Sequence, residues 1–319
     1  MGHATARVEA FAPATVANVA CGFDVLGLAL VGPGDTVVTQ RADGRGVRLA
    51  SVTGDGGRLP TAIDKNTATV AAAALLERHA PDAGVSLDLR KGLPLASGLG
   101  SSAASAVAAV VAVDGLLATA LPLDELLACA LAGEQVAAGA AHADNAAACL
   151  YGGLVLVRST TPPEVIRLPV PVELCVALVR PHLELSTAEA RACLGQDVPL
   201  TAAVAQWADL GGFVHALHTE DWDLMAGCLR DHIAEPHRIG AVPGFAAVRQ
   251  AALGAGALAC SLSGSGPAIF ALCRGTRQAD AASHAMEAAL AAAAGISCDR
   301  HVSAIHGEGA RRVADGGGG

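Results

Sequence analysis

Two kinds of hydrophobic pattern alternate along the chain. Short runs with alternating or continuous apolar side chains are typical of strands, and longer runs with an apolar period of about 3.6 residues are typical of helices. Strands are predicted at 6–11, 25–30, 35–40, 47–52, 85–90, 154–158, 164–168, 173–180, 257–262, 268–273 and 297–304. Helices are predicted at 66–79, 101–117, 123–138, 200–218, 221–232, 245–253 and 276–293, and a capping pattern at Ser186 begins another. Because strands and helices are mixed in both halves, the fold class is α+β.

The length of 319 residues favours two domains, because a single hydrophobic core rarely grows that large. The Thr- and Pro-containing segment at 159–163 is the expected crossover between them. We therefore predict an N-terminal domain at 1–160, a C-terminal domain at 161–310 and a disordered, Gly-rich tail at 311–319.

Composition narrows the class of protein. Hydrophobic residues make up 52% of the chain but aromatic residues only 3%, so small side chains should dominate the core. The net charge of −9 counts against binding to nucleic acids or to an anionic membrane surface. No apolar run is long enough to span a bilayer, and the nine cysteines form no Cys-x-x-Cys pair. These features predict a soluble, cytoplasmic protein with reduced thiols.

One stretch joins a predicted strand to a predicted helix and reads Pro-Leu-Ala-Ser-Gly-Leu-Gly-Ser-Ser-Ala-Ala at residues 94–104. Gly98 and Gly100 permit backbone conformations closed to other residues, and Ser101 or Ser102 is expected to cap the helix. The unpaired N–H groups and the positive dipole end of such a helix favour a polyphosphate with bound Mg²⁺. From these residues alone, an ordinary glycine-marked turn is an equally good interpretation.

Polar residues interrupt apolar surroundings at three further places. Asn18 and Asp24 occur in a Pro- and Gly-marked loop, where they either cap a turn or contact a ligand. Glu134 is the one acidic residue beyond the first turn of its predicted helix, either on the solvent face or at a buried site. The sequence His142-Ala143-Asp144-Asn145 has too few histidines for a zinc site, so a polar loop that lines a ligand is the better functional interpretation.

Taken together, these motifs resemble the GHMP small-molecule kinases. The phosphate loop of that family, Pro-x-x-x-Gly-Leu-Gly-Ser-Ser-Ala-Ala, is matched at every fixed position by residues 94–104. The family branch that phosphorylates L-homoserine is matched by further motifs in the expected order. These are Ala12-Pro13 with Asn18, Gly22-Phe23-Asp24, His142-x-Asp144-Asn145, Ser186-Thr187-Ala188-Glu189-Ala190-Arg191, Glu235-Pro236 with Arg238, and Ser263-Gly264-Ser265-Gly266-Pro267.

The resemblance implies an N-terminal domain like ribosomal protein S5 domain 2, a C-terminal ferredoxin-like domain and an active site between them. It implies ATP as the phosphoryl donor, Mg²⁺ held by Ser102 and Glu134, and a catalytic set of Asn145, Arg191, Ser102 and Glu134. The residues implied around ATP are Asn66 and Lys91, near the base, and Pro94, Ser97, Gly98, Leu99, Gly100, Ser101, Ser102, Ala103 and Ala104. Those implied around L-homoserine are Asn18, Asp24, His142, Asn145, Thr187, Arg191 and Arg238.

These residue types suit an amino-acid substrate. Asp24 offers a carboxylate to an ammonium group, and Arg191 and Arg238 offer guanidinium groups to a carboxylate. An amide such as Asn145 could orient the accepting hydroxyl toward the γ-phosphoryl group of ATP. Because phosphoryl transfer has a loose transition state, positioning and charge neutralisation can lower its barrier without a strong base. A base role for Asp144 stays open.

Sibling branches of the family act on mevalonate or galactose and use an aspartate and a lysine near the accepting hydroxyl. By the resemblance, Asn145 takes the place of that aspartate here, and no lysine precedes Lys65. No Gly-x-x-x-x-Gly-Lys-Ser/Thr motif occurs, which counts against a Walker-type ATPase. The resemblance thus implies a homodimer that makes O-phospho-L-homoserine for threonine biosynthesis. The alternatives are a kinase for another small alcohol and a catalytically silent protein that keeps the anion loop.

Overall fold

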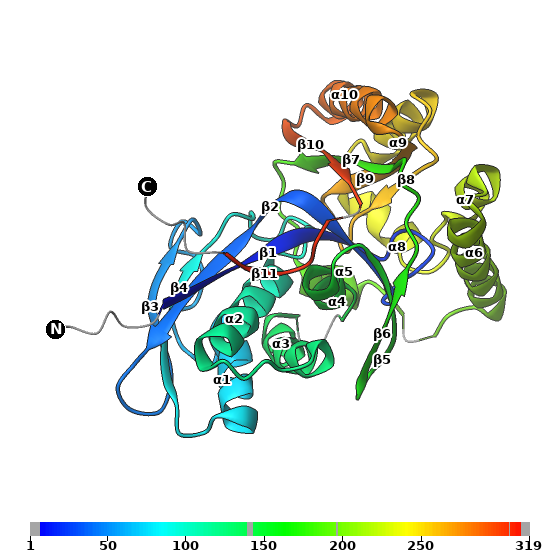
Figure 1. Cartoon of the computed structure of the whole chain (residues 1–319). Helices are drawn as coiled ribbons and strands as arrows, with labels where there is room; N and C mark the ends of the chain where they lie inside the picture. Colours follow the sequence, from blue (N-terminus) through cyan, green and yellow to red (C-terminus); the bar gives the residue numbers. More distant parts are fainter. Residues whose placement is uncertain (1–6, 139–142, 196, 306, 314–319) are drawn as a thin grey trace.

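The computed structural model describes residues 7–138, 143–195, 197–305 and 307–313. The strands form two sheets, and helices pack against each of them (Figure 1). The strands are β1 (Arg7–Ala17), β2 (Leu26–Arg41), β3 (Gly46–Thr53), β4 (Gly84–Arg90), β5 (Leu154–Thr160), β6 (Pro163–Leu168), β7 (Leu174–Pro181), β8 (Ala259–Leu262), β9 (Ile269–Arg274), β10 (Cys298–Ala304) and β11 (Arg311–Val313). The helices are α1 (Thr67–His79), α2 (Ser101–Leu117), α3 (Leu123–Ala138), α4 (Ala143–Tyr151), α5 (Thr187–Ala192), α6 (Leu200–Thr219), α7 (Trp222–Cys228), α8 (Glu235–Arg238), α9 (Phe245–Gly254) and α10 (Thr276–Ala294), with the 3-10 turn η1 (Ile239–Ala241).

The first sheet has the order β11-β1-β2-β4-β3, and β5 joins it by pairing with β2 and β6. Only β3 and β4 run parallel among its described pairs. Helices α1 to α4 gather on one face (Figure 1), and α2 packs on β1 and β2 as well as on α1 and α3. Because α2 is built mainly from Ala and Val, its neighbours approach it closely on all sides. The start of α2 is thereby fixed against the sheet.

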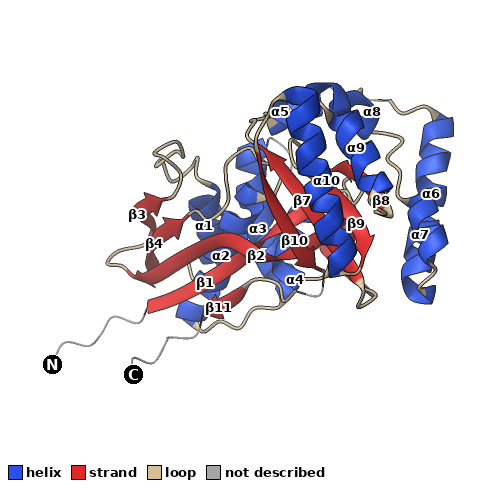
Figure 2. Ribbon diagram, turned by 90° about the horizontal axis from the view of Figure 1, so that it is seen from above, coloured by secondary structure: helices blue, strands red, loops and turns tan. Residues whose placement is uncertain are grey.

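The second sheet is antiparallel with the order β10-β7-β9-β8, and α9 and α10 pack against it (Figure 2). Its β8–β9 turn reaches the first half of the chain. The Gly264 N–H donates to the Ala17 carbonyl oxygen over 3.3 Å, and the Ser263 hydroxyl donates to the Gly98 carbonyl oxygen over 2.6 Å. The two halves therefore meet beside the phosphate loop.

Three strand predictions need correction in their bounds. Residues 25–30 and 35–40 do not form two strands, because β2 is continuous over both. A register shift between Pro13 and Thr15 of β1 accommodates the Gly- and Pro-containing stretch of β2 between them. Likewise, the first strand does not end at Phe11 but continues through Pro13 to Ala17.

The predicted domain limits also move. β6 pairs antiparallel with β5, so a boundary at 160/161 would divide a hairpin of the first sheet and is wrong in position. β11 pairs with β1, from Glu9 opposite Val313 to Phe11 opposite Arg311, so the prediction of disorder is wrong for residues 311–313. Both errors concern edge strands whose partners the local sequence does not reveal. Residues 314–319 lie outside the described part of the chain.

The thiols are mostly buried, as predicted. All nine cysteines are free, seven of them are buried, and Cys193 is exposed. Within the ranges described above, no helix combines the length and the apolar character needed to cross a bilayer.

Candidate active site

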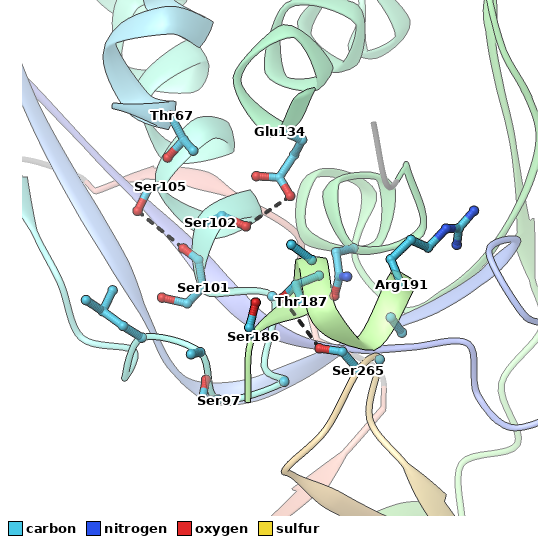
Figure 3. Close-up of a pocket in the computed structure, with 18 of the residues that line it drawn as sticks. Thr67, Ser97, Ser101, Ser102, Ser105, Glu134, Ser186, Thr187, Arg191 and Ser265 are labelled. Atoms are coloured by element: carbon cyan, nitrogen blue, oxygen red, sulfur yellow. Dashed lines mark hydrogen bonds between the residues drawn. The ribbon is translucent and has the colours of Figure 1, made fainter. Parts of the chain in front are cut away.

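A cavity of about 480 Å³ lies where the two halves of the chain meet. The first turns of three helices line it, at Thr67 of α1, Ser101 and Ser102 of α2, and Asp144 and Asn145 of α4. The labelled side chains of α1 and α2 face the same space as α5 and Ser265 of the second half (Figure 3). Because each helix N-terminus presents unpaired N–H groups and a positive dipole end, the cavity favours an anion despite the net charge of −9.

The phosphate loop connects β4 to α2, as predicted. Gly98 and Gly100 have φ of +78° and +66°, the left-handed region that favours glycine. A Cβ atom on Gly100 would lie 2.0 Å from Thr15 Oγ1, so the loop also needs glycine for close approach. The first α-helical bond runs from the Ala104 N–H to the Gly100 carbonyl oxygen over 2.9 Å. The N–H groups before Ala104 are therefore available to a ligand.

The prediction that Ser101 or Ser102 caps α2 is wrong. Gly100 is the N-cap residue and offers no side chain, while the Ser101 hydroxyl donates to the Leu93 carbonyl oxygen over 3.4 Å. The left-handed turn at Gly100 aims the hydroxyl back under the loop instead of along the helix axis. A phosphate contact by Ser101 stays a prediction, supported by its position on the cavity wall.

Lys91 lines the cavity, but its ammonium group is turned beneath the loop. Its side chain is 1% exposed and pairs with the fully buried Asp35 carboxylate. The ammonium also donates to the Ser101 carbonyl oxygen over 2.8 Å and to Ser105 Oγ over 2.9 Å. Burial lowers the pKa of Lys91, and the Asp35 carboxylate opposes that shift. The structure therefore gives this ammonium partners within the protein, and a position of Lys91 near the nucleotide base stays a prediction.

The side chains of Ser102 and Glu134 lie side by side at the N-terminus of α2 (Figure 3). The Ser102 hydroxyl donates to Glu134 Oε2 over 3.0 Å, and Glu134 is 3% exposed, which resolves the choice between a surface residue and a buried site. A hydroxyl and a carboxylate beside a phosphate loop are hard oxygen ligands of the kind that Mg²⁺ prefers. The described residues hold no cluster of three or more His, Cys, Asp or Glu side chains for a metal ion. Few protein ligands suit Mg²⁺, which is commonly bound by one or two carboxylates together with substrate phosphates.

The other residues implied around ATP divide into two groups. Asn66 and Ser97 line the cavity, but the Asn66 side chain caps α1 by accepting from the Ala68 N–H over 3.1 Å, and the Ser97 hydroxyl donates to the Pro94 carbonyl oxygen over 2.8 Å. Four residues are absent from the cavity wall. Of these, Leu99, Ala103 and Ala104 are buried beneath the loop, and Pro94 is exposed.

Asn18 and Asp24 belong to a strained loop after β1. Asn18, Val19 and Ala20 have φ of +68°, +44° and +57°, and the Gly22 N–H donates to the Asn18 carbonyl oxygen over 2.8 Å. Asn18 Oδ1 accepts from the Asp24 N–H over 3.1 Å, and Asn18 Nδ2 donates to the Gly264 carbonyl oxygen over 3.3 Å. Both residues line the cavity, so they cap a turn and face the site at once.

Arg191 and Arg238 lie close to Asp24, and their contact with a substrate stays a prediction. Arg191 Nη1 donates to Asp24 Oδ2 over 2.5 Å. The guanidinium carbons of Arg191 and Arg238 lie 5.3 and 5.5 Å from the centre of the Phe23 ring. Arg238 is also fixed by Nη1 donating to the Gly264 carbonyl oxygen over 3.0 Å. Burial lowers the pKa of Arg238, and the Asp24 charge opposes that shift.

The predicted polar loop at 142–145 is instead the start of a helix where it is described. Asp144 and Asn145 lie in the first turn of α4, and Asp144 Oδ1 accepts from the Asn145 N–H over 2.8 Å. Both line the cavity, whereas His142 lies outside the described residues. Thr187 begins α5, and its hydroxyl lies 3.5 Å from Ser265 Oγ (Figure 3).

Sequence reasoning missed several residues that hold the site in shape. Thr15 Oγ1 donates to Asn145 Oδ1 over 2.7 Å. Gln206 of α6 donates to the Cys21 carbonyl oxygen over 2.6 Å and accepts from the His232 N–H over 2.8 Å. Asp231 accepts from three successive N–H groups that lead into α8. The one local signal was a polar side chain on the apolar face of α6, at Gln206.

Comparisons with known proteins agree with this architecture. The family model for the GHMP kinases N-terminal domain matches residues 66–153, and the model for the GHMP kinases C-terminal region matches residues 213–292. The fold and the site thus define a GHMP-type kinase with two domains, and the chain belongs to the GHMP kinase family, in its homoserine kinase branch. The assignment to the homoserine kinase branch rests on relatives that match this chain over nearly its full length.

The homoserine kinase of Chlorobium phaeovibrioides is 47% identical over 315 residues, covering 95% of this chain and 98% of the relative. That of Xanthomonas campestris is 41% identical over 320 residues, covering 98% of each. A crystal structure of homoserine kinase from Cytophaga hutchinsonii superimposes with a TM-score of 0.93 at 46% identity, covering 98% of this chain and 99% of that one. Mevalonate kinase from L. major, at 17% identity and a TM-score of 0.67, shares the fold.

Proposed function

We propose that this protein transfers the γ-phosphoryl group of ATP to the side-chain hydroxyl of L-homoserine, giving ADP and O-phospho-L-homoserine. The observation that carries the proposal is one cavity with a phosphate loop at one end and Asp24, Arg191 and Arg238 at the other. The relatives named above carry homoserine kinase in their names and support the same substrate. The transfer forms a bond between the acceptor oxygen and the γ-phosphorus and breaks the bond from that phosphorus to the β,γ-bridging oxygen. The proton of the acceptor hydroxyl passes to a phosphate oxygen and from there to water.

Recognition of the substrate begins from a pair that is already formed. The Arg191 guanidinium and the Asp24 carboxylate compensate each other over 2.5 Å. The ammonium and carboxylate groups of an amino acid can replace each half of that pair, the ammonium at Asp24 and the carboxylate at Arg191 and Arg238. Both guanidinium groups lie over the Phe23 ring, whose face attracts cations and helps to keep them at the site during the exchange. A zwitterion thus keeps each of these charges paired.

Asn145 is the polar side chain of α4 next to the phosphate loop, and Gly100 would place a Cβ atom 2.8 Å from its Oδ1. In the proposal it orients the acceptor hydroxyl, and proximity and alignment supply most of the catalysis. An amide does not accept a proton at neutral pH, so this reaction proceeds without a strong base from that residue. The Asp144 carboxylate accepts a hydrogen bond from the Asn145 N–H, which suits a role in stabilising the first turn of α4.

Ser102 and Glu134 are the residues that would hold Mg²⁺, since their oxygens already lie within hydrogen-bond distance at the start of α2. When bound, the ion neutralises charge on the ATP phosphates. In the proposed complex, the N–H groups at the start of α2 and of the loop glycines bind the phosphates. Homodimerisation, the absence of nucleic-acid binding and a cytoplasmic location are kept as predictions, which sedimentation, gel-shift and fractionation experiments test.

A substrate panel tests the proposal directly. Purified protein with ATP and Mg²⁺ is given L-homoserine, mevalonate or galactose, and ADP release is measured together with phosphorylated product. Homoserine-dependent release is expected. A preference for mevalonate or galactose would instead indicate a sibling activity, and binding of homoserine without turnover would indicate a silent binding protein.

A further inference from the structure

Thr15 connects the phosphate loop to the Asn145 amide. It lies on β1 and is 0% exposed. Its N–H donates to the Leu99 carbonyl oxygen of the phosphate loop over 3.1 Å, and its Oγ1 donates to Asn145 Oδ1 over 2.7 Å. A Cβ atom on Gly100 would lie 2.0 Å from the same Oγ1. One buried residue therefore contacts both the loop that handles phosphate and the amide next to it.

The hydroxyl of Thr15 also decides which amide atom of Asn145 remains for a ligand. The amide is planar, with its oxygen and nitrogen on opposite corners. Since Oδ1 accepts the hydrogen bond from Thr15, Nδ2 is the atom that a ligand in the cavity can contact. Among the residues that the structure describes, none accepts a hydrogen bond from Nδ2.

We propose that Thr15 is a positioning residue that holds the Asn145 amide as a hydrogen-bond donor to the acceptor hydroxyl, at a fixed distance from the phosphate loop. This inference rests on the proposed function. A hydroxyl oxygen that accepts from Nδ2 keeps its second lone pair for the γ-phosphorus. Without the Thr15 hydroxyl, the amide rotates between two orientations, and one of them presents Oδ1 to the substrate.

The near-isosteric change Thr15→Val removes the hydroxyl and keeps the shape of the side chain. We expect kcat to fall by about 10- to 100-fold, because small losses of alignment are costly for in-line transfer. The KM for ATP should stay within about twofold, since the phosphate loop is contacted through the backbone N–H of residue 15. The variant Thr15→Ser retains the hydroxyl and should keep most of the wild-type kcat.

Thr39→Val is a matched control. Thr39 is also 0% exposed and lies on the neighbouring strand β2, but its Oγ1 has no hydrogen-bond partner among the described residues. This substitution removes a buried hydroxyl without touching the cavity. Its kcat and both KM values should match those of the wild type.

A binding measurement separates positioning from general damage to the fold. L-2-Aminobutyrate has the ammonium and carboxylate of homoserine but lacks its hydroxyl. By calorimetry, the wild type and Thr15→Ser should prefer homoserine by about 2- to 10-fold, the contribution of one hydrogen bond. Thr15→Val should lose that preference while binding L-2-aminobutyrate normally.

The outcomes are distinct. If Thr15→Val kept the wild-type kcat and the preference for homoserine, the positioning role would be overturned. If Thr15→Val did not fold, Thr15→Ala, which adds no methyl group near Gly100, would be measured in the same way, with the same result expected. A wild-type protein without homoserine-dependent ADP release would overturn the proposed function instead.

Discussion

Replacing Arg191 with methionine separates the contribution of this residue to folding from its contribution to binding. The Arg191 and Asp24 side chains are 40% and 33% exposed, and an exposed ion pair contributes only about 0–1 kcal/mol to stability. Methionine keeps an unbranched apolar side chain against Phe23. We therefore expect the free energy of unfolding to fall by less than about 1 kcal/mol.

The loss in substrate binding should be larger. In the proposed complex, the Arg191 guanidinium donates a charge-assisted hydrogen bond to the substrate carboxylate, which is worth about 1.5–3 kcal/mol. Since about 1.4 kcal/mol corresponds to a factor of ten, the KM for L-homoserine should rise by about 10- to 150-fold. Arg238 remains in the variant, so binding is weakened and not abolished.

The assay compares L-homoserine with 3-aminopropan-1-ol, which keeps the hydroxyl and the ammonium but lacks the carboxylate. Steady-state ADP release should show a strong preference of the wild type for homoserine, and Arg191→Met should lose most of it. Arg45→Met is the control, because it breaks another exposed pair, with Asp82, whose side chains are 76% and 79% exposed. An Arg191→Met protein with the wild-type preference, or one destabilised by several kcal/mol in urea, would refute the reasoning.

Three further predictions follow from the site and the core. Glu134→Gln should lower kcat by about 100-fold or more with little change in homoserine affinity, because it removes charge from the ATP end only. Gly98→Ala should lower the free energy of unfolding by about 1–3 kcal/mol and raise the KM for ATP, because its Cβ would lie 2.8 Å from two carbonyl oxygens of the facing turn. The free energy of unfolding should fall above pH 9, because burial raises the pKa of the Cys260 and Cys273 thiols from 9.0 to about 12. Between pH 9 and 12 these thiols lose their protons in the unfolded chain but keep them in the folded protein. The free energy of unfolding should therefore fall by up to about 1.4 kcal/mol per pH unit for each thiol.

The measurements are single-turnover kinetics with calorimetry for Glu134→Gln, and urea unfolding for the other two. A wild-type kcat in Glu134→Gln would remove this residue from the proposed metal site. Gly44→Ala measures the conformational cost alone, because Gly44 has φ of +86° and a Cβ atom there would meet no other atom within 4 Å. Equal losses of stability at Gly44 and Gly98 would show that the close contact at Gly98 adds nothing. A stability that is flat from pH 9 to 11 would contradict the thiol argument.

Features encoded by neighbouring residues could be predicted from the sequence. The bounds of α2 and α3 are those expected, and Asn66 caps α1, because apolar periodicity and capping residues act over a few positions. The phosphate loop was recognisable for the same reason. The loss of the Ser101 cap was not, because it depends on the left-handed turn at Gly100.

Long-range pairing could not be predicted. β11 meets β1 about 300 residues away in the sequence, and no local pattern in a three-residue strand specifies that partner. The Asp35–Lys91 pair was equally hidden, since a buried aspartate on a predicted strand resembles any residue at a strand end. Its role emerges only when Ser101 and Ser105 are seen beside it.

The loop of Asn18 and Asp24 explains why sequence reasoning left two interpretations open there. Three consecutive non-glycine residues with positive φ cost on the order of 1–2 kcal/mol each, so neighbours must hold them in place. Those neighbours are remote, because Gln206 binds the Cys21 carbonyl oxygen from 185 residues away, and Gly264 accepts from Asn18. The substrate end of the cavity therefore takes shape only when both halves of the chain have folded together. The two interpretations, a turn cap and a ligand contact, describe the same arrangement. The Asp24 N–H donates to Asn18 Oδ1, and this hydrogen bond holds the Asp24 carboxylate beside Arg191.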